Sequence, residues 1–456
     1  MIPFLKALRR QGVASPYGPV LLSCAVFLVA WLFPPGTYSD LLHEPDYMFL
    51  DVFSFVFFFL CVASFLFGLR VSRVINPATW TRTAPSRGTV SPFLYFCIPL
   101  AVGCVGCVIT LIEYGAHVNF IMLLASQQGS MIKDVSKTGE TLIAGFWAKA
   151  PVLLTGIIWW SQLRLQQVGL ARSAKLFLTA LWFLAFALDI FTFVALVDRT
   201  ALIPMLTGVG LISLYWRQAS GRLRLSGAVF YGGTGGLIVV AFFLVVAFLR
   251  GNTAADLLVS NFLGYSVASY NRFAAVLHGQ MRYFYAGKGV YLFPYLENAY
   301  FITPFVKIQN VLNWPIYREL YNSEFASVAL AGLNTRYIWS GVFGYLYADL
   351  GWGALFYVFC SGILTGYLWM KLKAGSTAAV VLYPWVASWI VLWNSWNLLF
   401  NDDFVHLLSI AFLLAGWDKI FLVTRVLPSK VTRPELSAQV PRIGTVGPLW
   451  DSTAPQ

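Results

Sequence analysis

Runs of apolar residues long enough to cross a bilayer follow one another along most of the chain. A transmembrane helix needs roughly 20 such residues, and somewhat fewer where its ends reach the interface. By this criterion the pattern predicts about ten spans. They lie at residues 17–34, 51–69, 92–113, 143–162, 176–197, 200–216, 226–249, 353–370, 377–399 and 404–423. The long stretch between the seventh and eighth spans, 250–338, is expected outside the membrane.

The composition supports this interpretation and excludes a soluble globular protein. Of the 456 residues, 59% are hydrophobic and 11% are charged, and the mean hydropathy is +0.71. A soluble domain carries about 25% charged residues, so this chain has too few polar side chains to cover a water-exposed surface. The sequence therefore predicts an all-α integral membrane protein.

The positions of lysine and arginine predict the orientation, because the cytoplasmic loops of membrane proteins are enriched in both. With the N-terminus inside, most of the 31 basic residues are cytoplasmic, and the first outer loop, 35–50, has none. Both ends are then cytoplasmic, and the polar tail, 428–456, is expected to be disordered. The net charge of +12 follows from this topology, so no nucleic-acid partner is expected.

The first apolar run follows Lys6, Arg9 and Arg10 in the manner of a signal peptide. It ends at Phe33-Pro34-Pro35 without a small-residue cleavage site, so we expect it to remain as the first helix. All six cysteines fall inside predicted spans, and no disulfide framework is expected.

Segment 250–338 separates seven spans in 1–249 from three spans in 339–427. It contains seven basic residues, four acidic residues and many aromatic ones. Tyrosine and tryptophan favour the headgroup level of a bilayer and also stack on sugar rings. An interfacial cap and a glycan-binding surface are therefore both consistent with this segment.

A polar stripe is predicted within this segment. If residues 255–286 are helical, Asn271, His278 and Arg282 fall within about 40° of one another, with Arg272 beside Asn271. Gly279 is the position at which such a helix would break.

Arginine binds phosphate oxygens through two parallel hydrogen bonds. Arg272 and Arg282, supported by Arg199 and Arg336, are therefore candidate ligands for a lipid diphosphate. They would stabilise the charge that grows on a diphosphate leaving group. His278 or Asp349 is the candidate general base. The alternative is that these arginines meet lipid headgroups.

Two further acidic features lie near or within predicted spans. Asp189 lies inside the fifth span, where a charge usually faces a cavity or a partner. Asn401-Asp402-Asp403 is expected to be a simple exposed turn, because two adjacent carboxylates without a third ligand make a poor metal site.

The chain resembles the Wzy-type O-antigen polymerases, which polymerise oligosaccharide repeat units. The resemblance rests on many spans with one long outer loop, rich in Arg and Tyr, in the C-terminal half. It also rests on the stretch from Asn334-Thr335-Arg336 through Tyr347-Ala348-Asp349-Leu350-Gly351-Trp352-Gly353 to the glycine-containing span at 361–366. The turn Asp198-Arg199-Thr200 is similar to the family's outer arginine before a span.

The resemblance implies a glycosyltransferase-C-like fold in a bacterial inner membrane, with the active site facing the periplasm. The enzyme would transfer a growing glycan from undecaprenyl diphosphate to an incoming lipid-linked repeat unit, giving O-antigen or exopolysaccharide. The resemblance implies no metal or other cofactor, contacts with membrane lipids, and a chain-length-regulating co-polymerase as partner.

Three alternatives stay open at this point. An O-antigen ligase would transfer the same glycan to lipid A core. A polysaccharide-lipid transporter or flippase would use Asp189 on a transport path. A membrane-bound acyltransferase would need a histidine in a span, for which His406 is the candidate.

Overall fold

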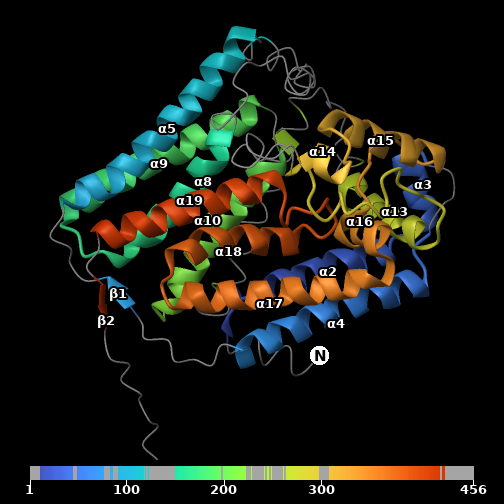
Figure 1. The fold of residues 1–456 in the computed structure, drawn as a ribbon, viewed down its shortest axis with the longest axis horizontal. Helices are drawn as coiled ribbons and strands as arrows, with labels where there is room; N and C mark the ends of the chain where they lie inside the picture. Colours follow the sequence, from blue (N-terminus) through green and yellow to red (C-terminus); the bar gives the residue numbers. More distant parts are fainter. Residues whose placement is uncertain are drawn as a thin grey trace, which may run out of the picture.

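The computed structural model describes residues 11–44, 49–75, 83–85, 91–117, 149–196, 199–221, 263–296, 308–421 and 424–426, with a few isolated positions between them. Helices make up most of these residues, and the protein belongs to the all-α class (Figure 1). The predicted seventh span, 226–249, is almost entirely outside the described residues, and so is the predicted tail, 428–456.

Nine of the predicted spans correspond to helices, although several boundaries differ by a few residues. These helices are α2 (Tyr17–Trp31), α4 (Val52–Ile75), α5 (Pro92–His117), α8 (Ala150–Gln167), α9 (Arg172–Ala195), α10 (Arg199–Ala219), α17 (Ala354–Lys373), α18 (Thr377–Val391) and α19 (Asp402–Phe421).

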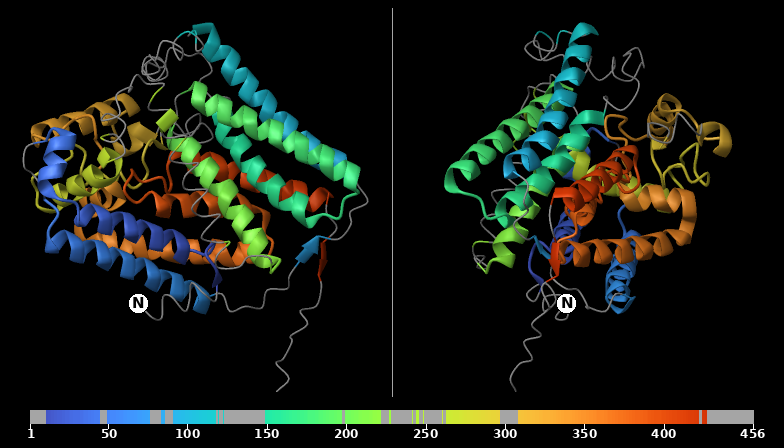
Figure 2. Two further views of the ribbon diagram at one scale, coloured as in Figure 1. Left: turned by 180° about the vertical axis from the view of Figure 1, so that it is seen from behind. Right: turned by 60° about the vertical axis from the view of Figure 1, so that its left-hand side comes forward.

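In the part of the chain that the structure describes, five helical stretches are long and apolar enough to cross a bilayer: α4, α5, α9, α19 and the continuous stretch Gly341–Lys373. A sixth is added if α2 and α3 (Pro35–Leu42) count as one broken span. On these lengths and hydropathies the chain is a multi-pass membrane protein. Helices α5 and α9 lie at the periphery of the bundle (Figure 2), where Leu176, Phe183 and Leu184 of α9 are exposed, as expected for side chains that face lipid.

The first predicted span ends where the sequence indicated. Helix α2 stops at Trp31, and α3 starts at Pro35 and is turned by 93° from it. Proline suits the first turn of a helix because its missing N–H group has no intrahelical partner there. The Pro34-Pro35 pair therefore ends one helix and begins the next.

The most buried helix of the bundle is α18, which packs against α2, α8, α10, α17 and α19. It is apolar on all sides, as expected for a helix surrounded by other helices. The prediction of a span to residue 399 is wrong, because the helix ends at Val391 and an irregular segment follows, 392–401. Side chains in this segment bind backbone elsewhere. Asn394 Nδ2 donates to Tyr265 O (2.6 Å), and Asn397 Nδ2 donates to Tyr291 O (3.2 Å).

Helices α4 and α17 form the most extensive helix pair in the protein. Their backbones meet at Gly68 of α4 and at the Gly362-x-x-x-Gly366 motif of α17. A Cβ atom on Gly68 would lie 2.1 Å from Phe359 O, and one on Gly362 would lie 2.2 Å from Phe65 O. Small residues at such contacts let two membrane helices approach closely, which provides the packing that holds them together in lipid.

A helical assembly covers one end of the bundle (Figure 1). We call residues 264–296 and 308–340 the cap. The cap contains the π-helix η2 (Gly264–Ala268), α13 (Ser269–Leu277), α14 (Ile308–Leu312) and α15 (Tyr317–Leu330), and it packs on α16 (Gly341–Leu350). The 3-10 turn η4 (Gly351–Gly353) leads from α16 into α17. Two three-residue strands, β1 (Thr83–Pro85) and β2 (Thr424–Val426), pair antiparallel.

The predicted helix at 255–286 is confirmed over residues 263–277 and wrong from residue 278 onward, while 255–262 lie almost entirely outside the described residues. Helix α13 ends at Leu277, His278 is its C-cap, and Gly279 has a φ of 68°. Glycine adopts this left-handed conformation without steric cost, so it ends the helix here. Arg282 therefore leaves the helix face that it was predicted to share with Asn271.

The close contact between α4 and α17 predicts that Gly68→Ala is destabilising. The added methyl group meets backbone rather than a flexible side chain, and overpacking of this kind costs about 1–3 kcal/mol. Gly416→Ala on α19 is the matched control, because a Cβ atom there meets nothing within 4 Å. Thermal unfolding in detergent should show a lower Tm for the first variant only. Equal Tm values for both variants would contradict the packing described.

Candidate functional site

A fully buried ion pair joins Arg272 of α13 to Glu44, which follows α3, and both side chains are 0% exposed. Arg272 Nη2 donates to Glu44 Oε1 and also to Asn334 O (2.8 Å), while Nη1 donates to Ala268 O (3.2 Å). The same carboxylate accepts the Asn334 N–H (2.8 Å) and the Tyr38 hydroxyl. Arg272 is thus enclosed by protein partners, and its guanidinium holds the cap onto α3.

Asn271 extends this network on the neighbouring position of α13. Its Oδ1 atom accepts the Phe49 N–H (2.7 Å), and its Nδ2 atom donates to the Tyr38 hydroxyl (3.0 Å). The first part of the predicted polar stripe therefore faces inward, towards the chain segment between α3 and α4.

The other end of α13 presents an accessible pair. His278 Nε2 lies 3.3 Å from Asp51 Oδ1, and the two side chains are 32% and 46% exposed. Partial burial acts to raise the pKa of the Asp51 carboxyl, but hydrogen bonds from Ser54 and from His278 outweigh it and hold this pKa below its usual range. The carboxylate is therefore ionised near neutral pH, and it orients the imidazole.

Two further features surround this pair. Arg282 is exposed, and its guanidinium lies close to Gly279, the residue that follows His278. Phe53 lies beside the imidazole, with ring centroids 5.9 Å apart, and Trp352 packs edge-on against Phe53 at 6.2 Å. We call His278, Asp51 and Arg282 the boundary group, because they lie where the cap meets the aromatic ends of the membrane helices.

Asp349 and Arg336 lie elsewhere in the cap region. Asp349 accepts the backbone N–H groups of Gly287 (3.0 Å) and Tyr291 (2.7 Å), so it anchors the chain that follows Arg282. The Arg336 side chain is exposed, and its backbone N–H donates to Asn334 Oδ1 (3.0 Å). Asn334 therefore separates Arg336 from the buried Arg272.

Arg199 is the first residue of α10, which packs mainly against α8, α9 and α18, and its side chain lies outside the described residues. Of the predicted site residues, the structure places Arg282 next to Gly279, the residue that follows His278. Arg272 and Arg336 both bind Asn334, and Asp349 contacts the loop that follows Arg282.

A buried carboxyl group that sequence reasoning did not single out lies in α15. Glu324 is 4% exposed, and its electrostatic neighbours are Tyr283, Tyr291 and Tyr345. The rings of Tyr283 and Tyr291 stack on Tyr345 at 5.1 and 5.2 Å. Burial raises the pKa of Glu324 to about 8. A signal was present in the sequence, since Glu324 falls midway between Leu320 and Val328 on the apolar face of an amphipathic helix.

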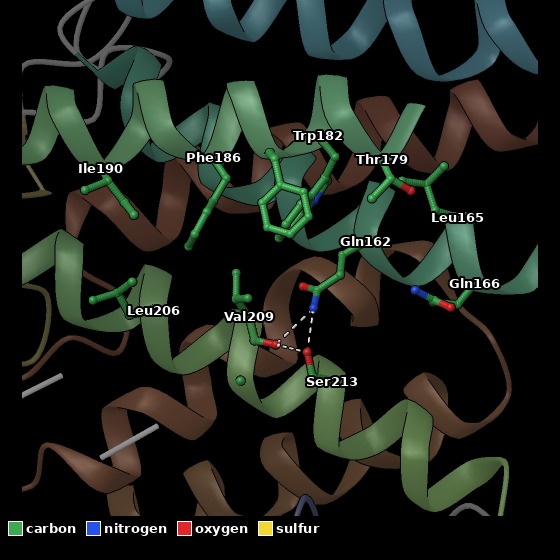
Figure 3. Close-up of a pocket in the computed structure, with 12 residues that line it drawn as sticks. Gln162, Leu165, Gln166, Thr179, Trp182, Phe186, Ile190, Leu206, Val209 and Ser213 are labelled. Carbon is green, nitrogen blue, oxygen red and sulfur yellow. Dashed lines mark hydrogen bonds between the residues drawn. The ribbon is translucent and has the colours of Figure 1, made fainter. Parts of the chain in front are cut away.

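A cavity of about 490 Å³ lies between α8, α9 and α10 (Figure 3). Its walls are mostly apolar, with Trp182, Phe186 and Leu206 among them. Gln162 is its main polar group and donates from Nε2 to Ser213 Oγ (2.8 Å) and to Val209 O (3.1 Å). The described side chains that line this cavity include no charged group and none of the predicted site residues.

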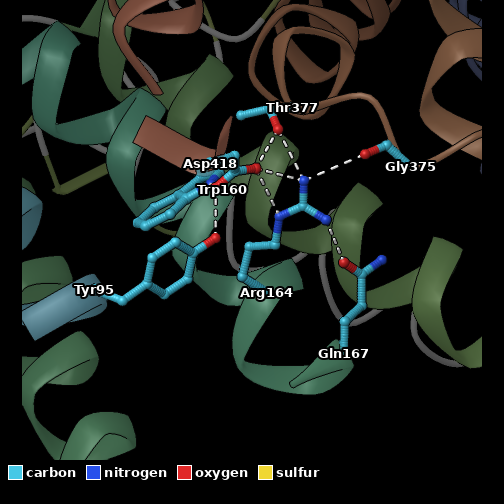
Figure 4. Close-up of polar contacts among 7 residues, drawn as sticks. All are labelled: Tyr95, Trp160, Arg164, Gln167, Gly375, Thr377 and Asp418. Carbon is cyan, nitrogen blue, oxygen red and sulfur yellow. Dashed lines mark hydrogen bonds and ion pairs between the residues drawn. The ribbon is translucent and has the colours of Figure 1, made fainter. Parts of the chain in front are cut away.

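Two buried ion clusters tie α8 to α19. At one end, Lys149 Nζ lies 2.7 Å from Asp402 and 2.6 Å from Asp403. At the other end, Arg164 Nη2 lies 2.6 Å from Asp418 Oδ2, and Asp418 Oδ1 accepts the Tyr95 hydroxyl at 2.5 Å (Figure 4). The two helices therefore run side by side in the same direction.

The first of these clusters corrects the prediction of an exposed turn at Asn401-Asp402-Asp403, since all three residues are buried and Lys149 supplies the counter-ion. Asp189 is also fully buried, and its partner is the Thr155 hydroxyl, which donates to Oδ2 at 2.8 Å. Within the described residues, no group of three or more His, Cys, Asp or Glu side chains is arranged to hold a metal ion.

These features define the class of the protein: a multi-pass α-helical membrane protein with a helical cap over one end of its bundle. No family model, curated protein or solved structure significantly matches the chain.

The burial of Arg272 predicts that Arg272→Ala costs about 3–5 kcal/mol, because it leaves Glu44 charged and unpaired inside the protein. Arg282→Ala removes an exposed guanidinium from the same cap and should change stability by less than about 0.5 kcal/mol. Thermal unfolding of both variants in one detergent tests the difference. A similar loss of stability in both variants would show that burial does not distinguish the two arginines.

The raised pKa of Glu324 predicts a pH-dependent effect of Glu324→Gln. Between pH 4.5 and about 8 the unfolded chain releases this proton while the folded protein retains it, so wild-type stability falls as pH rises. The neutral variant lacks this penalty. The Tm of the variant minus the Tm of wild type should therefore increase from pH 5 to pH 8. The corresponding gain in unfolding free energy is on the order of a few kcal/mol. A Tm difference that is constant with pH would contradict the assignment.

Proposed function

We propose that the protein polymerises undecaprenyl-diphosphate-linked oligosaccharide repeat units. The observation that carries this proposal is the boundary group: a histidine oriented by a carboxylate, beside an exposed arginine, at the junction of cap and membrane helices. Exposed Phe53 and Trp352 adjoin it, and aromatic side chains favour the headgroup level of a bilayer. A lipid-linked diphosphate would present its reacting bond at this level.

The reaction is a glycosyl transfer between two lipid-linked glycans. The acceptor hydroxyl attacks the anomeric carbon of the donor, the bond from that carbon to the diphosphate oxygen breaks, and undecaprenyl diphosphate leaves. His278 takes the proton of the attacking hydroxyl, and Asp51 stabilises the imidazolium that forms. Arg282 stabilises the negative charge on the leaving diphosphate.

Arg272 takes a different role in this account from the one its sequence position suggested. Its partner Glu44 satisfies its charge, so it is a positioning residue that fixes α13 and thereby His278. Arg336 and Arg199 remain candidate supporting cations for the diphosphate, and Asp349 remains the alternative base.

The proposed topology has about ten spans, a glycosyltransferase-C-like arrangement and both ends in the cytoplasm of a bacterial cell. Two observations support it. Helices α8 and α19 run in the same direction, as the predicted spans 143–162 and 404–423 require. Helix α10 ends at the side of the bundle opposite the cap, and the described chain resumes within the cap. A membrane span at 226–249 would carry the chain from one side to the other. The cap would then face the periplasm, with a chain-length-regulating co-polymerase as partner.

A transporter or flippase is the second candidate, and Asp189 is the observation that favours it. This carboxyl group lies within a membrane helix, and its Oδ1 atom has no hydrogen-bond partner in the described part of the chain. Buried acids of this kind occur on ion and proton pathways.

The test is an in vitro reaction of the purified protein in nanodiscs with lipid-diphosphate-linked repeat units and EDTA. A product ladder spaced by one repeat unit supports the polymerase. Transfer of the glycan to added lipid A core, without a ladder, would identify a ligase. Neither product from a folded sample would favour the transporter and Asp189.

The boundary group predicts that Arg282→Ala abolishes the ladder while the protein stays folded. His278→Gln should lower the rate about 10²–10⁴-fold, the usual contribution of a general base. Arg318→Ala is the matched control, since Arg318 is also exposed on the cap but lies on α15, outside the boundary group. Full ladders from the Arg282 variant, or equal loss in the Arg318 variant, would exclude this site.

A further inference from the structure

A second pocket, with two cationic side chains in its lining, lies at the end of the bundle opposite the cap. It has a volume of about 170 Å³ and is formed by the start of α2 and the ends of α4 and α17. Its lining includes Tyr17, Leu69, Arg73, Trp369 and Lys373. These helix ends lie farthest from the cap, because α2 leads towards the cap while α4 and α17 lead away from it (Figure 1).

Two cations of the pocket are held by aromatic rings. Arg73 Nη2 donates to the Tyr17 hydroxyl (2.6 Å), and its guanidinium lies 5.5 Å from the centre of the same ring. Lys373 Nζ lies 5.7 Å from the ring centre of Trp369. The two cations are close enough to repel each other. Their positions therefore concentrate positive charge at one place on the bundle.

Among the described residues, no carboxylate balances this charge. None of the described residues that line the pocket is acidic, and neither cation forms an ion pair with any of them. In the sequence, the stretches that adjoin the pocket residues, 1–16, 70–91 and 367–376, contain no Asp or Glu. They contain nine basic residues: Lys6, Arg9, Arg10, Arg70, Arg73, Arg82, Arg87, Lys371 and Lys373. The sequence next to the pocket therefore supplies no carboxylate to balance its charge.

We propose that this pocket binds the headgroup phosphate of an anionic phospholipid. The pocket lies at the ends of two helices that are long and apolar enough to cross a bilayer, which is the level of lipid headgroups. Paired cations between membrane helices match the charge of such a headgroup, and arginine and lysine donate hydrogen bonds to its phosphate oxygens. Tyr17 and Trp369 adjoin it as aromatic side chains do at membrane interfaces. This inference is independent of the proposed glycosyl transfer.

General attraction between basic loops and an anionic membrane is the competing explanation, and it makes a different prediction. It would depend on the number of positive charges and not on their place. Arg70 and Lys371 lie on the same two helices as Arg73 and Lys373 but outside the pocket lining. Removing each pair changes the net charge equally, so the two double variants separate a site from a charged surface.

The test uses the full chain in a neutral detergent, titrated with phosphatidylglycerol or phosphatidylcholine and followed by native mass spectrometry. Wild type should bind phosphatidylglycerol in preference. The double variant Arg73→Gln with Lys373→Gln should weaken that binding roughly 10- to 30-fold, because the loss of each cation weakens it about 5-fold and the two factors multiply. Arg70→Gln with Lys371→Gln should change it less than about 2-fold. Arg73→Lys with Lys373→Arg keeps both charges and should retain binding, and Lys373→Gln alone tests the site if the double variant does not fold.

Three results would overturn the proposal. Equal weakening in the two glutamine pairs would mean general surface attraction. Equal affinity for phosphatidylcholine would mean that the phospholipid charge is not recognised. Full displacement of the lipid by inorganic phosphate at similar concentration would mean that the pocket takes a free phosphate and not a lipid.

Discussion

The buried ion pair between Arg272 and Glu44 is the contact on which the arrangement of the cap depends. Two charges withdrawn from water are costly unless they are paired and further hydrogen-bonded. Here Asn334 and Tyr38 add hydrogen bonds to the pair, and only Arg272 Nε lacks a partner among the described residues. The pair and these hydrogen bonds join α13 to the chain that leaves α3. Asp51 follows Glu44 by seven residues and His278 follows Arg272 by six, so the first pair brings the second pair together at the edge of the cap.

The bilayer sets the second constraint, since irregular backbone at membrane depth must find partners within the protein. In the segment 392–401, Trp393 O accepts the Val342 N–H (2.8 Å), and Leu398 O accepts the Trp385 indole N–H (3.0 Å). The side-chain amides of Asn394 and Asn397 in turn donate to backbone carbonyls of the cap. Ion clusters at both ends of α8 and α19 hold these two helices in parallel, and Asp418 gathers Tyr95, Trp160 and Arg164 around one carboxylate. Polar contacts thus hold the segment 392–401 against the cap and set how α8 and α19 align along their length, which apolar packing alone does not specify.

Local features of the sequence predicted much of the fold. Long apolar runs indicated most helices, Pro34-Pro35 marked the end of α2, and Gly279 marked the end of α13. Contacts between distant residues were not predictable in this way. Glu44 and Arg272 are separated by 228 positions, and Lys149 and Asp403 by 254. Because these partners are not evident from the sequence, Arg272 was predicted to bind a diphosphate and Asp402-Asp403 was predicted to be an exposed turn. His278 and Arg282 were selected for their chemistry, and the turn at Gly279, rather than a shared helix face, makes them neighbours.

If the buried ion pair between Arg272 and Glu44 positions the cap and the boundary group, removal of its carboxylate should loosen the cap. Hydrogen–deuterium exchange of Glu44→Gln measures this effect, because the variant leaves Arg272 buried without its counter-ion. We expect faster exchange in peptides from 264–296 and 331–340, with unchanged protection in α17 and α18. Unchanged exchange in the cap, or equal loss of protection throughout the bundle, would contradict it.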